Sequence, residues 1–223
     1  DALKATPLAG SYGIGHTRWA THGRPTEENA HPHRDGHGRI ALVHNGIVEN
    51  YLALKHQLEK EGYVFVTETD TEAIAHLISK HYAGNLEEAV RKAVKQITGV
   101  FALAIICKEE QGKLIAVRSG PPVVVGVGED EFFVASDVPA ILNHTREVYF
   151  LDDGDMAVIS REGVRLTDFD GKPIERKITR ITWDPIMAEK GGYKHFMQKE
   201  IFEQPRAVRE TLINRVGQVS GRV

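Results

Sequence analysis

The residues most able to do chemistry in this 223-residue sequence are the histidines crowded near its start. Six of the 11 histidines fall in one stretch, and they are His16, His22, His31, His33, His37 and His44. Imidazole is a frequent zinc ligand, so the stretch could hold a metal ion. No Asp or Glu accompanies these histidines at a known ligand spacing, however, so loop or packing histidines are the favoured interpretation.

The Asn45-Gly46 pair allows two interpretations. Asn-Gly between apolar runs is the preferred turn of a β-hairpin. The segment that follows has a helical pattern, which makes the pair a strand-to-helix turn instead. Such a turn exposes backbone N–H groups beside an amide side chain, and an oxyanion hole is built from such donors. The residues alone leave the two interpretations open.

Arg18 and Asp70 are charged residues at expected element ends. Arg18 follows an expected strand, in a loop that also holds Trp19, Thr21 and His22. An exposed arginine beside a packed tryptophan is the simple interpretation. Asp70 lies in the first turn of an expected helix, where the helix dipole stabilises a carboxylate whether or not it binds a ligand.

Hydrophobic periodicity and turn residues predict an α+β domain with mainly antiparallel sheets. Helices are expected from Ile47, after a capping box that joins Thr69 to Glu72, after a capped start at Asn85, and over 197–214. The segment 100–107 is apolar throughout, so this strand is expected to be covered on both faces. The strands are expected at 11–16, 39–43, 100–107, 114–117, 123–127, 131–135, 147–151, 155–160 and 163–168.

Composition excludes several classes of function. The formal net charge is -3, so there is no basic excess for binding nucleic acid. No apolar run approaches the roughly 20 residues of a membrane span. Cys107 is the one cysteine, so no internal disulfide can form, and a reducing, cytoplasmic compartment is expected. Because Cys107 ends an apolar run, we expect a buried thiol rather than a nucleophile.

Four short motifs, followed by two more, carry a resemblance to a known family. They are His16-Thr17-Arg18-Trp19-Ala20-Thr21-His22-Gly23, Asn29-Ala30-His31-Pro32-His33, Val43-His44-Asn45-Gly46-Ile47, Glu68-Thr69-Asp70-Thr71-Glu72, Ala135-Ser136-Asp137 and the run 195–205. Together they resemble the glutaminase domain of the glucosamine-6-phosphate synthase family. That family is a branch of the N-terminal-nucleophile (class II) glutamine amidotransferases.

The resemblance implies a fold and a reaction. The expected fold is a four-layer αββα sandwich, and the expected reaction is hydrolysis of the glutamine side-chain amide. The ammonia would pass to a sugar-phosphate isomerase domain that converts fructose 6-phosphate to glucosamine 6-phosphate. Neither a metal nor an organic cofactor is implied. Glutamine and the isomerase domain are the expected partners, in a homo-oligomer that contacts neither nucleic acid nor membrane.

The resemblance also implies a role for each site residue. Arg18 would bind the α-carboxylate of glutamine with support from Thr21 and His22, and Asp70 would bind the α-ammonium. Asn45 and Gly46 would form the oxyanion hole. Trp19 would gate the passage of ammonia, and His31 matches a family histidine near the site.

The sequence departs from the family pattern at both ends. The family nucleophile is an N-terminal cysteine, whereas this sequence begins at Asp1 and ends at Val223. We therefore expect a sandwich truncated at its N-terminus, with residues 1–193 as the glutaminase domain and 194–223 as the connection to an absent isomerase domain. Such a fragment should be inactive alone. The alternatives are a glutamine-binding regulatory module and another class II amidotransferase, such as amidophosphoribosyltransferase.

Overall fold

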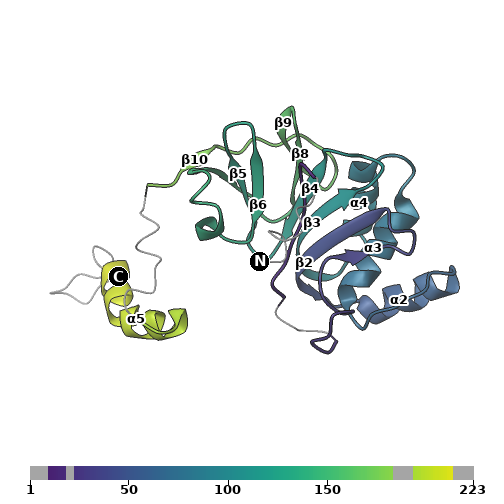
Figure 1. Ribbon diagram of the computed structural model, residues 1–223, viewed down its shortest axis with the longest axis horizontal. Coiled ribbons are helices and arrows are strands. Elements are labelled where there is room, and N and C mark those ends of the chain that lie inside the picture. The colour runs from purple at the N-terminus through teal and green to yellow at the C-terminus, as the bar shows by residue number, and fades with distance from the viewer. Residues whose placement is uncertain (1–9, 19–22, 183–192, 213–223) are drawn as a thin grey trace. The chain divides into compact units, whose positions relative to one another are not determined.

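A computed structural model gives the structure of this chain and describes residues 10–18, 23–182 and 193–212. The chain separates into two compact units, residues 1–181 and 182–223 (Figure 1). The described part of the second unit contains the helix α5 (Phe196–Leu212), which was expected from the sequence and continues through Pro205. The domain boundary expected after residue 193 stays a prediction, since residues 183–192 lie outside the described ranges.

The first unit is built on a six-stranded sheet in which every pairing is antiparallel, in the order β1-β2-β3-β4-β8-β9. Its strands are β1 (His33–Arg34), β2 (Ile40–Val48), β3 (Gly99–Cys107), β4 (Leu114–Ser119), β8 (Asp155–Ser160) and β9 (Gly163–Asp168). Hairpin-like turns after β3 and β8 link neighbouring strands. The antiparallel sheet expected from the turn-linked strands is therefore confirmed.

Three helices cover one face of this sheet (Figure 1). They are α2 (Tyr51–Lys60), α3 (Asp70–His81) and α4 (Leu86–Val94). The expected cap of α4 is confirmed, because the Glu88 N–H donates to Asn85 Oδ1 at 3.1 Å. The apolar stripe of α4 and nearly all of α3 are buried against β2, β3 and β4. This interface forms the larger core of the unit.

A second, four-stranded sheet has the order β10-β7-β5-β6. Its strands are β5 (Val124–Val127), β6 (Phe132–Ala135), β7 (Glu147–Phe150) and β10 (Thr179–Arg180). Side chains of both sheets share a second core, in which Ala102 and Ala157 meet Val125. The strand β3 therefore packs on both faces, as its apolar run predicted, and the first three layers are helices, sheet and sheet.

The outer face of the second sheet carries a smaller core. There Val124 and Val148 pack against a short 3-10 helix, η1 (Val138–Ala140), the turn over 141–144 that follows it, and Ile181. The α+β class is confirmed. Among the described residues of the first unit, η1, this turn and Ile181 contribute to the cover of the outer face.

Two expectations were wrong, one about the presence of a strand and one about the start of a helix. No strand forms at 11–16, where the exposed residues around Gly13 and Gly15 join no ladder with a described strand. The helix expected from Ile47 begins at Tyr51 instead, because β2 continues to Val48. Ile47 pairs with Val100, so the backbone at this position is committed to the sheet.

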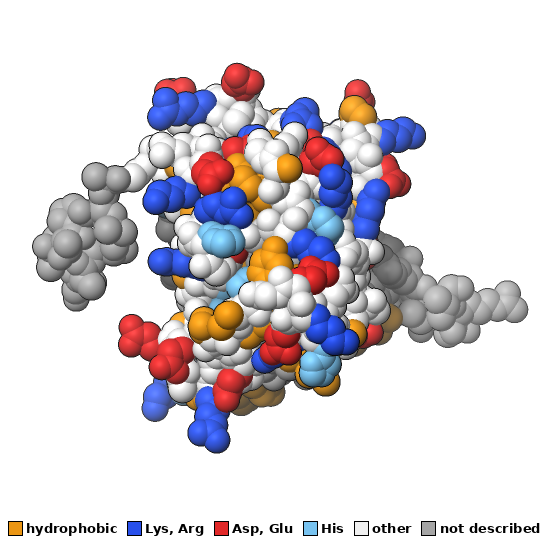
Figure 2. Space-filling view, turned by 90° about the vertical axis from the view of Figure 1, so that its right-hand side faces the viewer, with side chains coloured by type: hydrophobic (Ala, Val, Ile, Leu, Met, Phe, Trp, Pro, Cys, Tyr) orange, Lys and Arg blue, Asp and Glu red, His pale blue; other side chains and the backbone are white. Residues whose placement is uncertain are grey.

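The surface and the helices add two observations. Seen from the helical side, basic and acidic side chains are interspersed without a broad area of one sign (Figure 2). No helix among the described residues combines the length and the apolar character that crossing a bilayer requires.

Candidate active site

The end of β2 carries the Asn45-Gly46 pair. Asn45 pairs with Ala102 of β3 and Gly46 with Phe101, so the pair lies within the sheet. The expected strand-to-helix turn is therefore wrong, and so is the hairpin alternative. Both residues are half-buried, and Asn45 lines a pocket of about 510 Å³ between the two sheets.

Gly46 is a glycine because the backbones of β2 and β3 approach closely beside it. Its φ is +134°, a conformation that residues with a side chain rarely adopt. A Cβ atom at Gly46 would lie 2.0 Å from the carbonyl oxygen of Val100. Packing alone therefore requires glycine here, whatever the backbone N–H of Gly46 does in a reaction.

His16, the first residue of the histidine-rich stretch, contacts Asn45 from the loop that leads to Arg18. Its Nε2 lies 2.6 Å from Asn45 Oδ1, and its Nδ1 accepts a hydrogen bond from the backbone N–H of Arg18 at 2.9 Å. His16, Thr17 and Asn45 line the same pocket. The loop and the strand end, 29 residues apart, thus form one cluster.

Arg18 is held by its own loop. Its guanidinium donates to the carbonyl oxygens of Arg24 at 2.8 Å and Gly23 at 3.3 Å. Its φ of +49° is left-handed, which turns the chain sharply after Thr17. The side chain is half-buried rather than a free surface arginine. The loop thus presents a cation of fixed orientation next to His16.

Asp70 is the first residue of α3 and is buried. Its carboxylate accepts the backbone N–H of Val48 at 2.9 Å, which ties the start of α3 to the end of β2. The positive end of the helix dipole stabilises a negative charge at this position. Asp70 is therefore held at the same end of β2 that contains Asn45 and Gly46.

The rings of His16, His31 and His33 form a chain of contacts. The ring centroids of His16 and His31 are 4.3 Å apart, and those of His31 and His33 are 4.8 Å apart. Burial, followed by the charges of His16, His33, His44 and Arg18, lowers the pKa of His31 to about 3. His31 is therefore neutral at pH 7.

Arg18 and Asp70 have opposite electrostatic effects on His33, which is at one end of this histidine chain. Burial lowers the pKa of His33, and the charge of Glu72 opposes that shift. Smaller effects come from Arg18, which lowers this pKa, and from Asp70, which raises it. The structure thus brings Arg18, His31 and Asp70 into one neighbourhood. Among the described residues, no three His, Cys, Asp or Glu side chains come together as metal ligands would.

His44 supports the cluster from within β2. Its Nδ1 lies 3.0 Å from Thr71 Oγ1, so the strand is joined to the first turn of α3 a second time. Burial lowers the pKa of His44 to about 4, more than the nearby Asp70 raises it. A neutral imidazole therefore sits between the sheet and α3 at pH 7.

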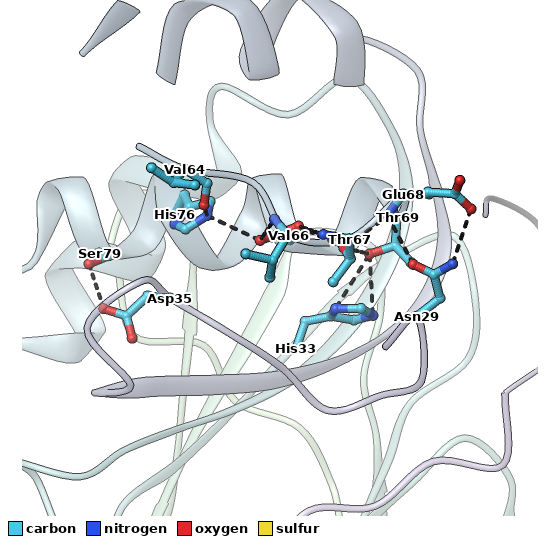
Figure 3. A network of polar contacts seen from close by, with 11 residues as sticks. Asn29, His33, Asp35, Val64, Val66, Thr67, Glu68, Thr69, His76 and Ser79 are labelled. Carbon is cyan, nitrogen blue, oxygen red and sulfur yellow. Dashed lines mark hydrogen bonds and ion pairs between the residues drawn. The ribbon is translucent and has the colours of Figure 1, made fainter. Parts of the chain in front are cut away.

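A polar latch that the sequence analysis missed holds the segment before α3 (Figure 3). Asn29 Oδ1 accepts the Glu68 N–H at 2.9 Å, and Asn29 Nδ2 donates to Glu68 Oε2 at 3.2 Å. Glu68 Oε2 also accepts the Arg24 N–H at 3.1 Å. The loop that holds Arg18 is therefore fixed to the residues that precede Asp70. The two partners are 39 positions apart, so no local pattern could reveal the pair.

The expected capping box at Thr69 does not form. Thr69 is the N-cap residue of α3, but its side chain makes no capping bond and lies 3.2 Å from His33 Nε2. Glu72 instead accepts the backbone N–H groups of Val66 and Thr67 at 2.9 and 2.7 Å. Burial would raise the pKa of Glu72, but these bonds and His76 outweigh burial and lower the pKa to about 2.

The other candidate residues are placed as follows. Cys107 is buried at the end of β3, as expected, and so cannot act as an exposed nucleophile. Trp19, Thr21 and His22 lie outside the described residues. The described candidates that come together are Arg18, His31, Asn45, Gly46 and Asp70.

A family model described as a glutamine amidotransferase domain matches residues 16–143. A glutamine–fructose-6-phosphate aminotransferase (isomerizing) of Clostridium tetani is 50% identical over 97% of this chain, and one of Aquifex aeolicus is 56% identical over 90%. The chain spans 36% and 34% of these two relatives.

Solved structures show a similar fold. The glutamine phosphoribosylpyrophosphate amidotransferase of B. subtilis, complexed with ADP and GMP, superposes with a TM-score of 0.59 at 30% identity. The match covers 69% of this chain and 34% of that chain. A structure described as the allosteric regulatory enzyme of purine biosynthesis has a TM-score of 0.55 at 29% identity, and the match covers 64% and 31% of the two chains.

Proposed function

Because this chain belongs to the glutamine amidotransferase family, we propose that it is the part of a longer enzyme that binds free L-glutamine for the release of ammonia from the side-chain amide. The ammonia would serve the conversion of fructose 6-phosphate to glucosamine 6-phosphate. Relatives at 50% and 56% identity support this assignment over phosphoribosylpyrophosphate amidotransferase, which is 30% identical. The observation that carries the proposal is that Arg18 is joined through His16 to Asn45 of β2, and that Asp70 is bonded to Val48 at the end of the same strand.

Recognition of glutamine requires one cation and one anion, because the free amino acid is a zwitterion. Arg18, oriented by the Gly23 and Arg24 carbonyls, would form a forked ion pair with the α-carboxylate. Asp70, negative and anchored by the Val48 N–H, would bind the α-ammonium. Thr21 and His22 are close to Arg18 in the sequence, and we assign them to the same end of the ligand, whereas Trp19 would gate the passage of ammonia. His31 would form a neutral wall of the site.

Hydrolysis requires stabilisation of the negative oxygen that develops when the amide carbon is attacked. The Asn45 amide and the Gly46 backbone N–H are the proposed donors. Cys107 is buried in β3, so the described residues supply recognition and charge stabilisation rather than the attacking thiol. The expectation that an N-terminal cysteine supplies the thiol stays a prediction.

The other parts of the reaction are placed in the longer protein. We infer that a sugar-phosphate isomerase domain, which receives the ammonia, accounts for length that the relatives have and this chain does not. We also place the enzyme in the cytoplasm as a homo-oligomer, and the single buried cysteine supports a reducing compartment. Residues 1–193 would then act as the glutaminase domain.

The recognition proposal is tested by calorimetric titration with glutamine and two truncated analogues. Arg18→Ala and Asp70→Asn should each weaken glutamine binding by about 2–5 kcal/mol, the loss expected when a desolvated charge pair is broken. The analogue 4-carbamoylbutanoate lacks the α-ammonium, and 4-aminobutanamide lacks the α-carboxylate. The Asp70→Asn variant should bind 4-carbamoylbutanoate with the same affinity as the unchanged protein. The Arg18→Ala variant should likewise bind 4-aminobutanamide with unchanged affinity.

Arg34→Ala is the matched control, because Arg34 is an exposed arginine of β1. It should leave the affinity for glutamine unchanged. Equal losses for all three ligands in either site variant would contradict the assignment, since the substituted residue would then act on the fold rather than on one end of glutamine. Circular dichroism of each variant would show whether it remains folded.

A further inference from the structure

The hydrogen bonds of His16 fix which of its ring nitrogens carries the proton. The backbone N–H of Arg18 can only donate, and it lies 2.9 Å from His16 Nδ1. Nδ1 must therefore present its lone pair, and the proton of the neutral imidazole must sit on Nε2. The side chain is half-buried, and the His31 ring contacts it at 4.3 Å, which restricts its rotation.

The proton on Nε2 in turn fixes the orientation of the Asn45 amide. Nε2 lies 2.6 Å from Asn45 Oδ1, and only the oxygen of the amide can accept this proton. The Asn45 nitrogen then faces away from His16. Among the described residues, no hydrogen-bond partner of Asn45 Nδ2 is found, and Asn45 lines the pocket of about 510 Å³.

The orientation matters because the two ends of an amide have opposite effects on an oxyanion. Nδ2 donates two hydrogens and stabilises a negative oxygen, whereas Oδ1 can only accept and would repel it. An asparagine that rotates freely presents the wrong end for part of the time. A donor fixed in advance needs no reorganisation when the charge develops.

We propose that His16 is a positioning residue that holds the Asn45 amide with Nδ2 toward the pocket, and so makes Asn45 an oxyanion donor. This inference rests on the proposed glutaminase function. His16 acts through Asn45 and needs no contact with glutamine. The backbone that fixes the His16 tautomer belongs to Arg18, so one short loop segment serves both ends of the ligand.

The test is a double-mutant cycle on glutaminase turnover in the natural full-length protein. His16→Ala should lower kcat by about 10–100-fold, which is somewhat less than the decrease in kcat expected when an oxyanion donor is removed. The KM for glutamine should stay within about threefold of its original value. His16→Gln keeps a side-chain N–H donor at a similar reach and should recover most of that loss. In an Asn45→Ala background, His16→Ala should cost nothing further.

Each outcome of the cycle is decisive. Additive losses, or a loss in KM rather than kcat, would overturn the positioning role, because His16 would then act independently of Asn45. If Asn45→Ala alone leaves turnover unchanged, the proposed oxyanion hole fails instead. Nitrogen-15 NMR of the unsubstituted protein gives a check that needs no variant. It should show the Nε2–H tautomer of His16, and the Nδ1–H tautomer would overturn the proposal.

Discussion

The substitution Gly46→Ala separates what packing demands of this site from what chemistry demands. A residue with a side chain at φ of +134° costs about 1–3 kcal/mol in backbone strain. The new Cβ would also lie 2.0 Å from the Val100 oxygen and 2.7 Å from its carbonyl carbon. Both atoms belong to the backbone of β3, so neither can move without opening the β2–β3 ladder. Relief of such overpacking costs about 1–3 kcal/mol more.

Gly163 provides a matched control for Gly46. Its φ is +131°, and a Cβ there would meet no atom within 4 Å. Gly163→Ala should therefore lower the free energy of unfolding by the strain alone, about 1–3 kcal/mol, against about 2–6 kcal/mol for Gly46→Ala. For a domain of this size each kcal/mol lowers Tm by about 2–4 °C.

Denaturant unfolding followed by circular dichroism measures both variants. Equal losses of stability would refute the close approach of β2 and β3 at Gly46. A larger loss for Gly46→Ala also has a consequence for enzymology. A loss of turnover in Gly46→Ala could then result from the disturbed sheet and not from the loss of an oxyanion donor. Asn45→Ala is therefore the cleaner test of the oxyanion hole.

Three further predictions concern the polar network and the histidines. Because the pKa of Glu72 is about 2 in the fold against 4.5 for the free group, the stability that it contributes is complete above about pH 4.5 and is lost as the pH falls toward 2. Glu72→Gln should flatten the acid side of a plot of Tm against pH, and an unaltered plot would contradict the pKa. The pKa of His31 is about 3 in the fold against 6.5 for the free imidazole. The stability that depends on a neutral His31 is therefore complete above about pH 6.5 and is lost as the pH falls toward 3. His31→Gln should reduce the loss of Tm across that range, and an unchanged slope would count against it. Asn29→Ala should speed hydrogen exchange at 23–30 and 64–69 more than in β3, as measured by mass spectrometry, and a uniform increase would disprove the latch.

Local sequence patterns predicted those parts of the fold that local forces determine. The cap of α4 depends on Asn85 and Glu88, three residues apart, and it forms as expected. The apolar run that became β3 predicted burial on both faces and the buried Cys107. In these cases the partner is adjacent in sequence or is any apolar neighbour, so the pattern is sufficient.

The errors arose where a distant partner competes with a local preference. Ile47 and Val48 fit a helical stripe, but β3 offers their backbones a ladder, so the strand continues. Thr69 and Glu72 fit a capping box, yet Glu72 is used by the N–H groups of Val66 and Thr67. Hydrophobic periodicity contains no information about which backbone donors need an acceptor elsewhere.

The sequence suggested a set of site residues, which stays a prediction, but it did not reveal the contacts among them. The contact of His16 with Asn45 and the latch of Asn29 with Glu68 join residues 29 and 39 positions apart. Such pairs leave no trace in composition or periodicity. A structure is required to show them, because their partners meet only after the sheet and α3 have packed.

The most direct test of the central claim is a crystal structure of the protein with L-glutamine bound. The account predicts the α-ammonium about 3 Å from the Asp70 carboxylate and the α-carboxylate at the Arg18 guanidinium. The side-chain amide oxygen should lie within hydrogen-bond reach of Asn45 Nδ2. Glutamine bound elsewhere, or bound here with its α-groups away from Arg18 and Asp70, would contradict the proposed site.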